Sequence, residues 1–166
     1  ILPAHRLLSN VNFDMSKMRK IEEYFDVHSV EQKQMLEELK EMSRTHHVFG
    51  MCFDGRCYLL KLKDENVMDG IIDSKKSKDW KRLDVTIIHA LLIDLIVDGP
   101  DNISYVIDEE EAMKKAEEKG NLVLFVNPTR IGEVKKIALN QEKMPGKATY
   151  FYPKLPTGLV MNRVSQ

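Results

Sequence analysis

The chain has 166 residues, which is long enough for one domain with a full hydrophobic core. Its 25 lysine and arginine residues nearly balance its 26 aspartate and glutamate residues, so no overall charge favours DNA or an acidic membrane as a partner. It has neither an apolar run near the ~20 residues of a transmembrane helix nor a secretory signal. We therefore expect a cytoplasmic protein with no membrane partner, and we do not expect nucleic acid as its ligand.

The chain starts in strand-like sequence at Ile1-Leu2-Pro3 and has no initiator methionine. This start is typical of a processed chain or of the second part of a longer protein. We expect residues 1–166 to form a single domain. The alternation over residues 1–8 predicts a strand, and a helix is predicted from Ser16 to Phe25, before extended residues 26–30.

An amphipathic helix is predicted from Glu31 to Arg44, because apolar residues recur there at three- and four-residue spacings: Met35, Leu36, Leu39 and Met42. A β-hairpin follows at about residues 47–63, since Asp54-Gly55 is a strong type I′ turn signal. This turn places Cys52 opposite Cys57 in a non-hydrogen-bonded pair, whose side chains lie closest. We expect structural thiols there, with a disulfide or a redox role as the alternative. We do not expect a metal at the two cysteines, because no second Cys/His pair completes a set of four ligands.

Residues 66–82 predict a solvated connection that contains a basic run, Lys75 to Arg82. Asp84 is expected to cap an apolar helix over residues 85–97 that ends at Gly99-Pro100.

The remaining pattern alternates between strands and helices. It predicts strands at 103–107, 122–126 and 158–164, a helix capped by Asp108 and stopped by Gly120, and a helix from Asn127-Pro128-Thr129 to about Leu139. This order predicts an α/β fold, with α+β as the alternative. We expect a mixed β-sheet with covering helices and one hairpin.

Familiar catalytic signatures are absent, including the P-loop, the dinucleotide-binding glycine motif, His-Glu-x-x-His and Gly-x-Ser-x-Gly. His89 lies in the apolar helix and is expected to be partly buried and hydrogen-bonded, with catalysis as the alternative. His46 and His47 have no carboxylate at metal-ligand spacing, so we expect them in a turn or at the surface.

Asn127-Pro128-Thr129 follows a buried-looking strand and opens a helix. The unpaired N–H groups of a helix N-terminus can bind an anion at the carboxyl end of a strand, and the Thr129 hydroxyl could help. The alternative is structural: Thr129 caps the helix and Asn127 satisfies a turn.

The stretch from Lys143 to Lys154 combines lysines, hydroxyls, prolines and three adjacent aromatic residues, without a carboxylate. Lys147 and Lys154 could neutralise a phosphate or carboxylate, while Thr149 and Tyr152 donate hydrogen bonds. The alternative is an edge segment whose rings cover the core and whose lysines discourage sheet pairing. As a binding site, we predict Lys147, Thr149, Tyr152 and Lys154 together with Asn127 and Thr129, and no metal ligand.

Several segments, in order, resemble the C-terminal half of the bacterial and archaeal "domain of unknown function 1015" family. They are Ile1-Leu2-Pro3, Phe49-Gly50, Leu83-Asp84-Val85, Ile103-Ser104-Tyr105-Val106, Phe125-Val126-Asn127-Pro128-Thr129 and Met144-Pro145 through Lys154 with Gly158-Leu159-Val160. The family's N-terminal half is ParB/sulfiredoxin-like, and its Asp-Gly-His-His-Arg motif does not occur here.

The resemblance implies an uncharacterised protein whose relatives include free-serine kinases and partition proteins. It therefore suggests the accessory half of a small-molecule phosphotransferase, inactive alone. The expected partners are its own N-terminal half and a small molecule, with a nucleotide or pyrophosphate and Mg²⁺ in the full-length protein. The alternatives are a ParB-like regulator that binds nucleic acid or protein, and a structural oligomerisation domain that forms a homo-oligomer.

Overall fold

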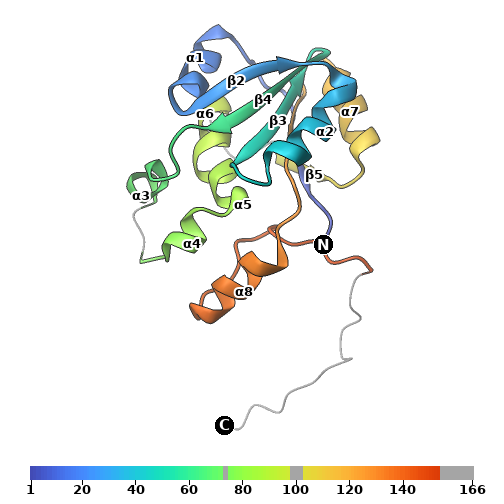
Figure 1. The fold of residues 1–166 in the computed structure, drawn as a ribbon. Coiled ribbons are helices and arrows are strands. Elements are labelled where there is room, and N and C mark those ends of the chain that lie inside the picture. The colour runs from blue at the N-terminus through green and yellow to red at the C-terminus, as the bar shows by residue number, and fades with distance from the viewer. Residues whose placement is uncertain (73–74, 98–102, 154–166) are drawn as a thin grey trace.

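A computed structural model describes residues 1–72, 75–97 and 103–153 of the chain (Figure 1). Its centre is a six-stranded sheet in the order β2-β4-β3-β6-β1-β5, in which every neighbouring pair is antiparallel. The strands are β1 (His5–Leu8), β2 (Phe25–Val30), β3 (Val48–Phe53), β4 (Arg56–Leu62), β5 (Ile103–Val106) and β6 (Leu122–Phe125). The predicted class, a β-sheet with covering helices and a hairpin at about 47–63, is confirmed, although the described strands pair antiparallel throughout and do not form the mixed sheet that was expected.

Helices cover both faces of the sheet (Figure 1). They are α1 (Met15–Tyr24), α2 (Gln32–Met42), α3 (Val67–Ile71), α4 (Lys78–Lys81), α5 (Asp84–Ile87), α6 (Ile93–Ile96), α7 (Glu109–Glu117) and α8 (Ile131–Leu139), with a π-helical turn η1 (Ile88–Leu92) between α5 and α6. In the part of the chain that the structure describes, no helix is long and apolar enough to cross a membrane.

Successive strand residues supply two separate cores because they point to opposite faces of the sheet. On β6, Leu124 packs with α1 and the α5–α6 helix, whereas Val123 packs with α2 and α7. On β4, Leu60 and Leu59 divide in the same way. All four residues of β6 are buried, which explains its uninterrupted apolar sequence and confirms that this strand is buried, as its sequence suggests.

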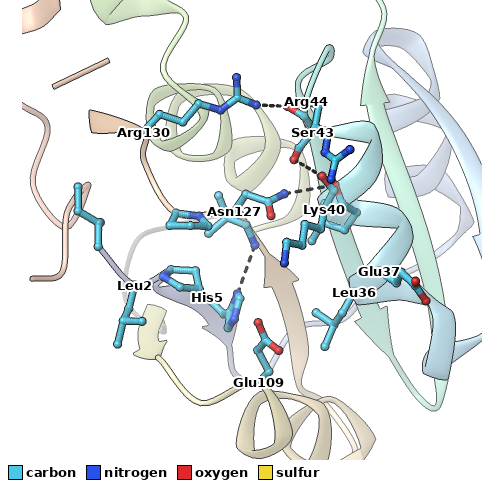
Figure 2. A pocket seen from close by; sticks show the side chains of 15 residues that line it. Leu2, His5, Leu36, Glu37, Lys40, Ser43, Arg44, Glu109, Asn127 and Arg130 are labelled. Atoms are coloured by element: carbon cyan, nitrogen blue, oxygen red, sulfur yellow. Dashed lines mark hydrogen bonds between the residues drawn. The ribbon is translucent and has the colours of Figure 1, made fainter. Parts of the chain in front are cut away.

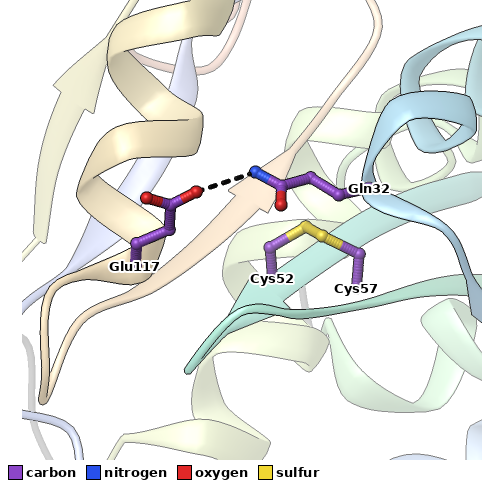
Figure 3. Close-up of a disulfide and its surroundings, with 4 residues drawn as sticks. All are labelled: Gln32, Cys52, Cys57 and Glu117. Atoms are coloured by element: carbon purple, nitrogen blue, oxygen red, sulfur yellow. Dashed lines mark hydrogen bonds between the residues drawn. A yellow bond between two sulfur atoms is a disulfide. The ribbon is translucent and has the colours of Figure 1, made fainter.

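The hairpin has the predicted turn and register. Asp54 and Gly55 have φ angles of 47° and 71°, as a type I′ turn requires, and Cys52 pairs with Cys57. The expectation of free thiols is wrong, because the two cysteines form a disulfide (Figure 3). Their Cα atoms are only 4.2 Å apart, and both side chains lie in the core beneath α2 and α7.

The termini of α2 and α7 meet above this disulfide. Gln32 Nε2, at the start of α2, donates a hydrogen bond of 3.1 Å to Glu117 Oε1, at the end of α7 (Figure 3). Asp108 caps α7 by accepting from the Glu111 N–H, as predicted, and Gly120 follows the helix with a φ of 82°.

Two expectations between residues 66 and 97 need correction. The connection over 66–82 is not only solvated: it contains α3 and α4, and Met68 is fully buried in the core. Asp84 does not cap the following helix, because it is the first helical residue, Leu83 occupies the cap position, and the Asp84 carboxylate binds His47 instead. Gly99-Pro100 and the predicted strand 158–164 lie outside the described residues.

Helix α8 lies away from the sheet, beside α4 (Figure 1). Its buried residue, Ile137, packs against Leu83 and Val85 in a small third core. Residues after α8 return across this core: Trp80 Nε1 donates to the Lys143 carbonyl at 3.0 Å, and Glu142 accepts from the Ser77 N–H at 3.0 Å. The C-terminal stretch is thereby anchored before it reaches the N-terminal strand.

Candidate functional site

A cleft of about 660 Å³ opens where β6 ends and the chain turns toward α8 (Figure 2). Its walls come from the N-terminal segment, from one side of α2 and from the turn before α8. The lining residues are Ile1, Leu2, Pro3, His5, Leu36, Glu37, Leu39, Lys40, Ser43, Arg44, Glu109, Val126, Asn127, Pro128 and Arg130. We call this space the β6 cleft.

Cationic and amide groups gather on one side of the β6 cleft (Figure 2). Arg130 donates to the Ser43 carbonyl, which holds its guanidinium against the end of α2, and Arg44 and Lys40 come from α2 or just beyond it. Asn127 Nδ2 donates to the Leu39 carbonyl at 3.3 Å. Charges of both signs line the cleft. Glu37 lies on α2, one turn before Lys40, and Arg44 pairs with Glu41 at 3.1 Å, whereas Glu109 lies beside His5, away from the cations (Figure 2).

His5 forms part of the wall of the β6 cleft although its side chain is only 1% exposed. Its Nδ1 accepts a hydrogen bond of 3.3 Å from the Val126 N–H, and its ring packs on Phe125. Burial and, secondarily, the charge of Arg6 lower the pKa of His5 to about 4. The imidazole is therefore neutral near pH 7, and its Nε2 has no hydrogen-bond partner among the described residues.

Two of the predicted site residues, Asn127 and Thr129, lie at this turn, where they line a small cavity of about 10 Å³ together with Lys147. Asn127 lines the β6 cleft, whereas Thr129 Oγ1 donates to the Ala148 carbonyl at 2.6 Å. Thr129 is not the helix cap, contrary to expectation: Arg130 occupies that position, and its N–H donates to Glu133 Oε2 at 2.7 Å. The Thr129 hydroxyl instead fastens the C-terminal stretch to the turn.

The predicted lysine–aromatic stretch crosses the N-terminal segment rather than entering the β6 cleft. The Leu2 N–H donates to the Tyr150 carbonyl at 2.8 Å, and Arg6 Nη2 donates to the Lys147 carbonyl at 3.4 Å. Lys147 Nζ lies 5.4 Å from the centre of the Tyr105 ring.

Beyond this crossing, the stretch borders a second, more open groove of about 750 Å³ beside the first turn of α7. Tyr152 lines it together with Tyr105, Tyr150 and the acidic residues 108–111. Lys154 lies outside the described residues. Ligand binding by Lys147, Thr149, Tyr152 and Lys154 stays a prediction.

A buried arginine joins this crossing to the sheet, and sequence reasoning did not find it. Arg6 is 2% exposed, and it donates to the Ala4 carbonyl and, through Nε, to His89 Nε2 at 3.2 Å. Burial lowers the pKa of Arg6 to about 10, and burial with the nearby Arg6 charge lowers the pKa of His89 to about 4. His89 is thus a partly buried hydrogen-bond acceptor, as expected. Arg6 has no sequence signal beyond its place in a predicted strand.

His47 was expected in a turn or at the surface but belongs to a charged network. Its Nδ1 lies 2.6 Å from Asp84 Oδ1, and its Nε2 lies 3.4 Å from Glu65 Oε2. Burial lowers the pKa of His47, but hydrogen bonds and charges from Asp84 and Glu65 outweigh it, so the pKa is raised overall. Arg82 of the predicted basic run pairs with Glu65 at 2.8 Å, which neutralises part of that run.

The network borders a smaller cleft of about 240 Å³ that shares Ser43, Arg44, Asn127, Pro128 and Arg130 with the β6 cleft. Within the described ranges, no group of three His, Cys, Asp or Glu side chains is arranged to hold a metal ion.

Comparisons with known proteins identify a family but no described function. No curated protein and no solved structure matches the chain. The family described as "Protein of unknown function (DUF1015)" matches residues 1–86, a segment that runs from the N-terminal strand through the hairpin to the start of α5. Because this match covers more than half of the 166 residues, the chain belongs to the DUF1015 family.

Proposed function

We propose that this chain is a small-molecule-binding domain whose β6 cleft holds the anionic group of a metabolite. The observation that carries this proposal is the convergence of Lys40, Arg44 and Arg130 with the Asn127 amide on one side of the cleft. Arginine binds carboxylate and phosphate through paired N–H donors, and lysine adds a compact charge. A phosphate or carboxylate placed there would be neutralised by Lys40 and Arg44 from the end of α2 and by Arg130 from the turn before α8.

The size and lining of the cleft support a metabolite rather than a macromolecule. Its volume of about 660 Å³ lies within the ~300–1,000 Å³ that is usual for small-molecule sites. Apolar side chains of Leu2, Leu36 and Val126 line it beside the polar groups. A few placed polar groups on an apolar lining are the usual composition of such sites.

A finer proposal is that the chain is the accessory part of a small-molecule phosphotransferase. It extends the family resemblance and would make an N-terminal half, a nucleotide or pyrophosphate, and Mg²⁺ the partners of this domain. Lys147, Thr149, Tyr152 and Lys154 would then form a second wall of the assembled site, with Asn127 and Thr129 beside it. Neutralising a transferred phosphoryl group by cations is the usual contribution of protein side chains to such chemistry.

A thermal-shift screen tests the coarser proposal, because a ligand that binds only the folded state raises the melting temperature. The probes are inorganic phosphate, pyrophosphate, nucleotides with and without Mg²⁺, and a set of carboxylates and amino acids. We expect phosphate-bearing or carboxylate-bearing probes to shift the wild type. Arg130→Gln and Arg44→Gln should each weaken binding about tenfold to hundredfold, the cost of losing a hydrogen bond to a charged group.

Lys135→Gln is the matched control, because this exposed lysine of α8 is not among the residues that line the cleft. Equal losses in all three variants would mean a nonspecific charge effect, and no shift with any probe would refute the cleft as an anion site. Strongly salt-dependent DNA binding would favour the regulator instead. For the finer proposal, turnover is measured in the full-length protein with and without Lys147→Ala. Equal turnover would show that Lys147 does not contribute to the phosphotransferase site.

A further inference from the structure

His5, a residue that lines the β6 cleft, has a buried hydrogen-bond donor without an acceptor among the described residues. His5 Nδ1 accepts the Val126 N–H, so in the neutral ring the proton must be on Nε2, and Nε2 is a donor only. This atom is buried and has no partner within the described chain. Buried donors in native proteins are nearly always paired, so an unpaired one in the wall of a cleft indicates a group that binds there.

The surroundings of His5 keep its ring uncharged and fixed in orientation. The pKa of the ring, about 4, leaves it uncharged over the physiological range, and Arg6, the next residue, opposes a second positive charge. The ring is also fixed in place by the Val126 N–H and by packing on Phe125 at 4.9 Å between ring centres. His5 therefore offers a fixed, neutral N–H, in contrast to the cations on the other side of the cleft.

We propose that His5 Nε2 donates to a second acceptor oxygen of the ligand, separate from the anionic group that the cationic side holds. The ligand class is then a small anion that carries a further carbonyl, carboxylate or phosphate oxygen at its other end. This inference rests on the proposed function, since it assigns a specificity-determining residue to the same cleft.

Glu109 is the residue of the chain that could accept the His5 Nε2–H in place of the ligand. Its side chain lies on the His5 side of the cleft and the residue is exposed, so it is the acidic group of the chain to test as a partner of Nε2 (Figure 2). Glu109→Ala separates the two cases. If Glu109 is the partner, this variant changes the Nε2–H signal of His5 in the ligand-free protein; if the ligand is the partner, the signal does not move.

The experiment compares phosphoglycolate, which has a carboxylate as its second acceptor, with ethyl phosphate, which has none. We expect the wild type to prefer phosphoglycolate in calorimetric titration. His5→Phe keeps a ring against Phe125 but has no N–H, so it should lose about tenfold to hundredfold of that preference. Its affinity for ethyl phosphate should not change. His5→Gln, which retains a donor near Nε2, should restore part of the preference.

Nitrogen-15 NMR of the histidines needs no variant and checks the contact itself. In the wild type, the Nε2–H proton of His5 should shift downfield with phosphoglycolate and not with ethyl phosphate. Thermal melting confirms that each variant is folded.

Three results would overturn the proposal. If both compounds bind and His5→Phe leaves the preference intact, the cleft remains an anion site but His5 does not select its ligand. If Glu109→Ala moves the Nε2–H signal without ligand, Glu109 is the partner. If neither compound binds the wild type, the proposed function and this inference both fail.

Discussion

Gly50 lies in β3, at the middle of the sheet, where Met35 of α2 and Phe125 of β6 approach it closely. A Cβ atom added there would lie 2.5 Å from Met35 Sδ and 3.0 Å from Phe125 Cβ. Both distances are well inside the ~3.5–4.0 Å at which nonbonded atoms pack. Gly50→Ala therefore forces Met35, which is fully buried on α2, to move away from the sheet.

The expected size of the effect follows from two opposing contributions. Overpacking a buried site costs about 1–3 kcal/mol, whereas replacing glycine by alanine in a strand gains about 0.5–1 kcal/mol. The Met35 side chain is flexible and can yield, but Phe125 Cβ is fixed by the backbone of β6. We expect a net loss of about 1–2 kcal/mol in the free energy of unfolding, measured by urea denaturation.

Gly70→Ala is the matched control, because no atom lies within 4 Å of its added Cβ and the residue is in α3. It should stabilise the protein by about 0.5–1 kcal/mol. Met35→Ala alone should cost about 2–5 kcal/mol by leaving a cavity, but less in the Gly50→Ala background, where the new methyl group fills part of it. A coupling of about 1–2 kcal/mol is expected in this double-mutant cycle. Strict additivity, or equal effects of Gly50→Ala and Gly70→Ala, would refute the packing argument.

Two further predictions concern His47 and the disulfide. The folded state raises the pKa of His47 above its ordinary 6.5, so the stability it adds is present below pH 6.5 and is lost as pH rises through the folded pKa. As pH rises from below 6.5 through the folded pKa, wild type should therefore lose stability in urea denaturation that His47→Gln does not lose. A parallel decline in both proteins would contradict this. The Cys52–Cys57 bridge closes a loop of sequence separation 5, so reduction by dithiothreitol should cost about 2 kcal/mol. Cys52→Ala/Cys57→Ala should be indifferent to the reductant, and a wild type equally indifferent would mean that the cysteines are not joined.

Sequence patterns correctly predicted those elements that depend on residues close together in the chain. Asp54-Gly55 fixes its turn through backbone conformation, Asp108 caps α7 through a side chain three residues from its target, and the apolar run of β6 reflects burial on both faces. These features depend on residues close together in the sequence. The same reasoning placed Asn127 beside a cleft, because a residue that follows a buried strand lies at the end of the sheet.

The site residues that were missed depend on contacts between distant segments. Arg6 and His89 are separated by 83 positions, and His47 and Asp84 by 37, so no spacing rule relates them. At Asp84 the local pattern and a distant contact lead to different outcomes. Its place in the sequence suits a helix cap, but its carboxylate binds His47, which the start of the hairpin brings near. His5 resembles an ordinary strand residue until Val126 is seen to satisfy one of its nitrogens and not the other.

The position of β1 in the sheet sets an order for assembly during synthesis. β1 leaves the ribosome before the other strands of this sheet, yet both of its neighbours, β5 and β6, come from residues 103–125. The β2–β4–β3 half can pair as soon as residue 62 is available, while β1 must wait with its backbone groups unpaired. A polypeptide cut to residues 1–86, the segment that the family model matches, would keep three paired strands and strand β1 with neither β5 nor β6 beside it. The residues beyond this segment therefore complete the sheet.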